Sequence, residues 1–173
     1  MSYDKLQHWH ELYSVAAGIA ATLMGLMFVV LSLGSRSLAT EQGAQVTRAL
    51  HTPIVVFFGT IIVVSMLMLM PDTAPAALGA LVGAVALGGI VYMVASGAYR
   101  IWRENELGLD DLVWYVVLPY VSYAALGAAA VMIWKAAPFG PHVEAGAVLL
   151  MLLVGIRNAW DLVVYSVQRG TRE

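Results

Sequence analysis

The chain contains no cysteine and few charged residues. Of its 173 residues, only 12% are charged. Without cysteine there can be no disulfide and no thiolate site for metal or redox chemistry. A soluble domain has roughly 25% charged residues, so this chain cannot cover itself with a solvated surface. The formal net charge of −2 gives no reason to expect a nucleic-acid partner.

Sequence patterns of common enzyme classes are also missing. The chain has no Gly-rich phosphate loop, no nucleophile elbow, no zincin histidine pair and no paired-carboxylate site. Between its apolar stretches, no segment is longer than about 20 residues, which leaves no room for a soluble catalytic domain. We therefore expect a protein that is not an enzyme and that binds no cofactor.

Long apolar stretches dominate the sequence instead. Hydrophobic residues make up 61% of the chain, and the mean hydropathy is +0.80. A helix that crosses a bilayer needs about 20 apolar residues. Five stretches approach or exceed this length: 12–33, 53–70, 76–99, 112–134 and 143–167. The sequence predicts an all-α, polytopic membrane protein, with residues 1–173 forming a single transmembrane domain of five helices in the lipid bilayer.

The distribution of lysine and arginine predicts the orientation. With five spans, the N-terminal tail and two of the loops share one face and hold Lys5 and Lys135. The opposite face holds six arginines, which are Arg36, Arg48, Arg100, Arg103, Arg169 and Arg172. Since positive charge in short loops favours the cytoplasm, we expect the N-terminus outside and the C-terminus in the cytoplasm.

Small residues recur at four-residue spacing on two of the predicted helices. Ala17, Ala21 and Gly25 lie on the first helix, and Gly79 and Gly83 on the third. Such spacing lets helix backbones approach closely in lipid. The two interpretations are packing within one protomer and a subunit interface between protomers.

A group of polar residues interrupts the last apolar stretch. Arg157, Asn158, Asp161 and Tyr165 share one face of the predicted helix, and we call them the polar seam. Arg157 and Asp161 are four residues apart, which suits a direct ion pair. A charge at mid-membrane costs at least roughly 2.5–3.5 kcal/mol on insertion scales, so it requires a partner or a function. The seam is a structural clasp, the lining of a small-ion pathway, or a docking surface.

A second polar cluster, His8, His10 and Glu11, lies at the predicted outer end of the first helix. His8 and Glu11 are three residues apart and could share a metal ion or a proton. Histidines solvated at the membrane interface explain the same pattern more simply. We therefore expect an outer-mouth polar cluster without a metal ion.

Two motifs carry a resemblance to a family. Trp9-His10-Glu11-Leu12-Tyr13 opens the first helix, and Arg157-Asn158-Ala159-Trp160-Asp161-Leu162 closes the last. Together they resemble a family of small bacterial inner-membrane proteins. The resemblance implies a bacterial inner-membrane location and makes the last-helix motif a hallmark of the family. It implies no activity.

These features lead to three functional hypotheses. The first is a homo-oligomeric, channel-like membrane protein with a pathway for small ions. Five helices hardly enclose a wide path, so permeation would favour assembly around an axis or between subunits. The second is a non-catalytic membrane partner or regulator of another complex. The third is a small-molecule transporter, although no internal repeat supports it.

Overall fold

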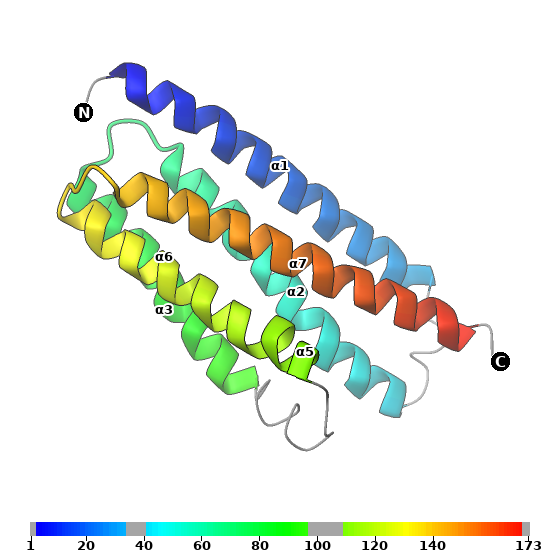
Figure 1. The fold of residues 1–173 in the computed structure, drawn as a ribbon. Coiled ribbons are helices and arrows are strands. Elements are labelled where there is room, and N and C mark those ends of the chain that lie inside the picture. Colours follow the sequence, from blue (N-terminus) through cyan, green and yellow to red (C-terminus); the bar gives the residue numbers. More distant parts are fainter. Residues whose placement is uncertain (1–2, 34–40, 97–108, 171–173) are drawn as a thin grey trace.

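The fold is entirely helical in the part of the chain that the computed structural model describes. That part comprises residues 3–33, 41–96 and 109–170, and for some residues within the helices it gives only the backbone. Figure 1 shows long helices that run side by side as a bundle. The elements are α1 (Tyr3–Leu33), α2 (Glu41–Met68), α3 (Pro75–Ser96), α5 (Leu109–Leu112), the π-helical turn η2 (Val113–Val117), α6 (Leu118–Trp134) and α7 (Gly140–Gly170).

Four helices are long and apolar enough to cross a membrane. They contain the segments Trp9–Val29, Pro75–Ser96, Leu109–Trp134 and Gly140–Asp161. The all-helical prediction is therefore confirmed, and the four helices indicate a multi-pass membrane protein. The apolar part of α2, Pro53–Met68, is shorter. α2 ends before Met70 because the chain turns at Pro71 and Asp72, where Asp72 has a left-handed backbone (φ 53°).

Of the eight basic residues that predict the orientation, all but Lys135 have side chains outside the described part. These are Lys5, Arg36, Arg48, Arg100, Arg103, Arg169 and Arg172. The backbone gives the relative direction of the helices. α1 begins at one end of the bundle and α7 finishes at the other, and the long helices alternate in direction along the chain (Figure 1).

Four helices form a ring, and the fifth packs on its outside. α2, α3, α6 and α7 each contact the next around the ring, and α1 lies against α2 and α7. Tyr123 of α6 joins opposite sides of the ring. Its hydroxyl is 3.0 Å from Thr60 Oγ1 of α2, and its ring packs edge-on against Phe57, with centroids 5.3 Å apart. The centre of the bundle is therefore filled by side chains.

Glycines allow α3 to pack closely on α6. A Cβ atom at Gly79 would lie 2.6 Å from the carbonyl oxygen of Ala130, and one at Gly89 would overlap the ring of Tyr123. Gly83 also faces Ala130. The small-residue pattern of the third predicted helix thus serves packing within one protomer. On α1 the pattern differs, because Ala21 and Gly25 are exposed and Gly25 has no atom of another residue near its Cβ position.

Aromatic side chains that are exposed or partly buried mark two levels along the bundle. Trp114 and Trp134 lie near the two ends of the continuous helix formed by α5, η2 and α6. They are about 20 residues, or about 30 Å, apart, which equals the thickness of a hydrocarbon core. Phe139, which directly precedes α7, and Trp160 of α7 repeat this spacing, and both are more than half exposed. Aromatic residues at such levels are typical of membrane interfaces.

Candidate functional site

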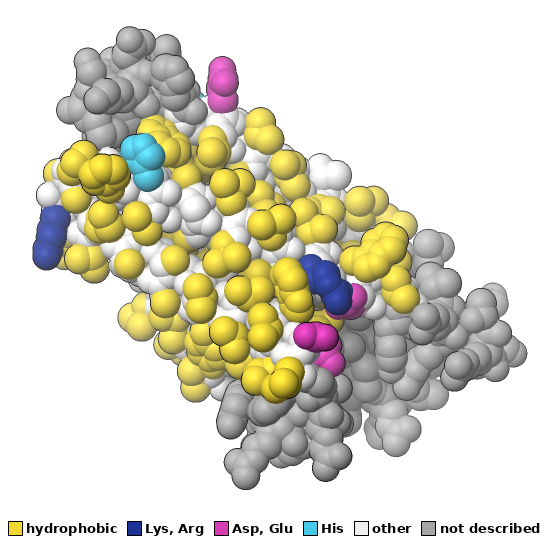
Figure 2. All heavy atoms as spheres, in the orientation of Figure 1, with side chains coloured by type: hydrophobic (Ala, Val, Ile, Leu, Met, Phe, Trp, Pro, Cys, Tyr) yellow, Lys and Arg dark blue, Asp and Glu magenta, His cyan; other side chains and the backbone are white. Residues whose placement is uncertain are grey.

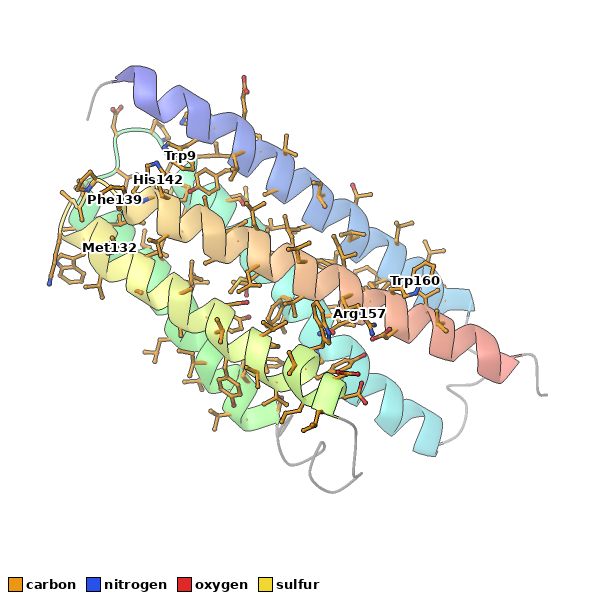
Figure 3. All side chains as sticks on the ribbon, viewed as in Figure 1. Trp9, Met132, Phe139, His142, Arg157 and Trp160 are labelled. Atoms are coloured by element: carbon orange, nitrogen blue, oxygen red, sulfur yellow. The ribbon has the colours of Figure 1, made fainter. Side chains whose placement is uncertain are left out.

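Arg157 and Asp161 form an ion pair on the surface of α7 (Figure 3). The Arg157 side chain is 43% exposed, and its guanidinium carbon lies 5.8 Å from the centre of the Trp114 ring. Tyr115 donates a long hydrogen bond of 3.4 Å to Asp161. The pair thus sits between α7 and η2, at the level of Trp114 and Trp160. Its level is that of an aromatic belt, where a cation reaches polar headgroups at lower cost than at mid-membrane.

The surface around this pair is mostly hydrophobic. Figure 2 shows an apolar face interrupted by few basic and acidic side chains. Exposed neighbours on α7 include Leu149, Leu153 and Ile156. The ion pair therefore borders whatever surrounds the bundle, lipid or a second protein, and not the centre of the protomer.

Asn158 points inward and supplies a hydrogen bond that the backbone of the neighbouring helix lacks. In η2, the Leu118 N–H donates to the carbonyl oxygen of Val113, five residues back. In this register the next carbonyl, that of Trp114, would need a donor at residue 119, and Pro119 has no N–H. Asn158 Nδ2 supplies the hydrogen bond to the Trp114 oxygen at 3.3 Å. The helix thus has a π-helical turn before Pro119, and a side chain from α7 supplies its missing hydrogen bond.

The polar seam does not contact the polar side chains at the centre of the neighbouring helices. The structure pairs Tyr123 with Thr60 and turns Ser122 back to the Leu118 carbonyl. Trp114 and Tyr115 contact the seam instead. The side chain of Tyr165, the fourth predicted member, lies outside the described residues.

The second polar site lies at the opposite end of α7, where Tyr13 donates a hydrogen bond to Glu144 Oε2. Both side chains are fully buried between α1 and α7. Tyr13 also lies 3.4 Å from the Pro141 carbonyl oxygen. The other carboxyl oxygen, Glu144 Oε1, has no hydrogen-bond partner among the described residues. A buried, half-satisfied carboxyl group requires an explanation in terms of a ligand, a water molecule or a function.

Two of the three side chains of the predicted outer-mouth cluster lie in the described part of the chain. His10 and Glu11 are exposed on α1, and the side chain of His8 lies outside the described part. The neighbouring residues Trp9 and Tyr13 make the inward contacts. The Trp9 ring packs edge-on against His142, with centroids 4.8 Å apart. In the described ranges, no three His, Asp or Glu side chains are grouped closely enough to hold a metal ion.

Sequence reasoning missed Glu144 as a site residue. The predicted fifth helix began at residue 143, which placed the charged Glu144 at the start of that helix and therefore at the membrane surface. α7 begins at Gly140, with Pro141 in its first turn, which places Glu144 a full turn inside the helix. One sequence signal was available. Glu144, Met151 and Asn158 recur every seven residues, and such positions share one helix face.

Ser65 lies between these two sites along the axis of the bundle. Its hydroxyl is fully buried and has no partner among the described residues. On α2, Ser65 is seven residues beyond Phe58 and shares its face, and Phe58 packs against Gly155 of α7. Because α2 and α7 are antiparallel (Figure 1), Ser65 lies near the level of Val148, about 6 Å along the axis from Glu144.

The buried polar side chains are therefore distributed along the bundle. We call this set the interior polar series: Glu144, Ser65, Ser122, Thr60 and Asn158. Its ends, Glu144 and Asn158, are about 21 Å apart on α7. Three members of the series (Glu144, Ser65 and Asn158) each have a buried oxygen without a partner in the described part of the chain. Apolar side chains, among them Met151, fill the space between.

Comparison of the chain with models of protein families, with curated proteins and with solved structures gives no match. The family resemblance of the first and last helices stays a prediction.

Proposed function

We propose that this protein provides a membrane pathway for small ions, and that the proton is the ion its interior suits best. The observation that carries the proposal is the interior polar series with its three unpartnered oxygens. Unsatisfied buried polar atoms are costly, and in membrane proteins polar side chains in the interior mark ion paths and proton relays.

The close packing of the interior favours the proton over larger ions. Tyr123, Phe58 and Met151 are fully buried at the centre of the bundle, which leaves no wide opening within a protomer. A proton moves between hydroxyl, carboxyl and water oxygens and needs no such opening. Metal cations would need several oxygen ligands at one point or a path between subunits of a homo-oligomer.

Proton flux into liposomes tests this proposal. Purified protein is reconstituted with an internal pH-sensitive dye, and a potassium gradient with valinomycin sets the voltage. We expect proton entry above that of empty liposomes, and lower entry for Glu144→Gln. Glu11→Gln is the matched control, since Glu11 makes the same chemical change on the exposed face of α1. Flux equal to that of empty liposomes at both voltage signs would overturn the pathway.

The second candidate is a non-catalytic partner of another membrane protein. The observation that favours it is the ion pair between Arg157 and Asp161, which lies at the outer surface of α7 and not in the interior of the bundle. Beside it, Trp160 is 66% exposed. In this case Trp160→Ala would weaken an association measured in mild detergent and leave proton flux in liposomes at the background level.

Topology and location complete the proposal. We infer five spans, which are the four long apolar helices and the shorter apolar part of α2. The N-terminus then lies outside and the C-terminus in the cytoplasm. The excess of basic residues on one face, six arginines against two lysines, supports this orientation. The start of α1 and the finish of α7 lie at opposite ends of the bundle, which supports an odd number of spans. The resemblance of the terminal motifs supports a bacterial inner membrane.

A further inference from the structure

We propose that Glu144 and Tyr13 form a proton-binding site between α1 and α7, at the end of the bundle where α7 begins. Its role as the entry to the interior polar series rests on the proposed function, but the binding of a proton does not. Figure 3 shows the aromatic and histidine side chains of Trp9, His142 and Phe139 gathered at this end.

The geometry of the carboxyl group supports binding at one particular oxygen. Oε2 accepts the Tyr13 hydroxyl hydrogen, so this oxygen is engaged. Oε1 has no partner in the described part of the chain and is buried. A proton that adds to Oε1 converts the carboxylate into a carboxylic acid, and its release restores the carboxylate. Neither step breaks the hydrogen bond from Tyr13.

The number of nearby oxygens favours a proton over a metal cation. Besides the carboxyl oxygens, the oxygens found near the site are the Tyr13 hydroxyl and the Pro141 carbonyl, which are themselves 3.4 Å apart. A hard cation such as calcium takes 6–8 oxygen ligands. A proton requires one oxygen, and the Oε1 atom offers it.

Among the described side chains, the other titratable groups near this end of α7 make no contact with Glu144. Residues 53–68 of α2 contain no titratable side chain, and α6 contains only Tyr120 and Tyr123. Tyr123 bonds to Thr60. On α1, His10 and Glu11 are exposed, and on α7 the exposed His142 packs against Trp9. Glu144 therefore has Tyr13 as its polar contact among the described residues.

The position of Ser65 gives the bound proton a direction in which to leave. The Ser65 hydroxyl is unpartnered and lies about 6 Å deeper along the axis than Glu144. Two hydrogen bonds through one water molecule span about 5 Å, so more than one water molecule would be needed to join the two oxygens. Ser65 is thus the member of the interior polar series that follows Glu144 along the axis of the bundle.

Infrared spectroscopy of the reconstituted protein tests the site directly. A protonated carboxyl group has a C=O stretching band that a carboxylate lacks. We expect one component of this band to change with pH in the unmodified protein and in Glu11→Gln, to be lost from Glu144→Gln, and to shift in Tyr13→Phe, which lacks the hydroxyl donor. A band that is identical in Glu144→Gln and the unmodified protein at every pH would overturn the proposal.

A second measurement on the unmodified protein covers the case in which Glu144→Gln fails to fold. A hydrophobic carbodiimide reacts with protonated carboxyl groups inside a membrane, and peptide mass spectrometry locates the adduct. We expect the adduct on Glu144, with less modification at alkaline pH; modification confined to other carboxyl groups would overturn the site. An infrared band or an adduct assigned to Glu144, without proton flux, would support the binding site and refute the pathway. Proton flux without a band or an adduct at Glu144 would support the pathway and refute the binding site.

Discussion

Glu144 and Asn158 lie on the same face of α7, about four helical turns apart, and each keeps one buried oxygen without a partner in the described part of the chain. Each also has one satisfied polar atom. Glu144 accepts from Tyr13 of α1, and Asn158 donates to the Trp114 carbonyl of η2. α7 is thus held to a different neighbour at each end by a buried polar side chain.

The ion pair of Arg157 and Asp161 predicts coupled effects on stability. Arg157→Met and Asp161→Leu each remove one partner and should lower the unfolding temperature in detergent. The double variant should lose less than the sum of the two, with a coupling of about 1 kcal/mol, because the side chains are 43% and 31% exposed and solvent or headgroups screen the pair. Additive losses would mean that the two side chains stabilise the protein through separate partners.

Asn158 and Pro119 should also be coupled. Asn158→Leu leaves the Trp114 carbonyl without its donor and should cost about 1–3 kcal/mol. Pro119→Ala restores a backbone N–H that can serve this carbonyl or return the turn to the α-helical register. Asn158→Leu should therefore cost less in the Pro119→Ala background, measured by thermal unfolding in the same detergent. An equal cost in both backgrounds would contradict this account of η2.

Gly89 and Gly88 form a matched pair for testing the packing of α3 on α6. A Cβ at Gly89 overlaps the buried ring of Tyr123, which Thr60 and Phe57 hold in place, whereas a Cβ at Gly88 meets nothing. Gly89→Ala should destabilise the protein by about 1–3 kcal/mol through overpacking. Gly88→Ala should leave the unfolding temperature unchanged or slightly higher. Equal effects of the two substitutions would show that α3 and α6 pack differently.

The orientation predicts which engineered cysteines an impermeant reagent reaches. The chain has no cysteine of its own. Ala74→Cys lies in the turn between α2 and α3, and Asp110→Cys lies in α5 at the other end of the bundle. In intact cells an impermeant thiol reagent should label Ala74→Cys and spare Asp110→Cys. Labelling of Asp110→Cys alone would invert the topology, and labelling of both or neither would be incompatible with the two turns lying on opposite sides.

For the polar seam, the helical pattern predicted contacts within α7 but not contacts with neighbouring helices. Spacing predicted that Arg157 and Asp161 share a face, and the structure pairs them. Spacing within α7 could not give their neighbours, because these depend on how α7 is rotated against η2. The π-helical turn at Val113–Val117 changes that rotation by one residue, and Trp114 and Tyr115 beside it contact the seam.

The sequence by itself determined the all-helical, membrane-spanning character of the chain, since apolar length and scarcity of charge are properties of consecutive residues. It also determined the i,i+4 ion pair, which a single helix contains. Only the tertiary structure decided that Glu144 is buried against Tyr13, that Asn158 serves the Trp114 carbonyl and that His10 and Glu11 stay exposed. The physical reason is that contacts between helices are set by their relative rotation and axial register, to which all neighbouring side chains contribute at once.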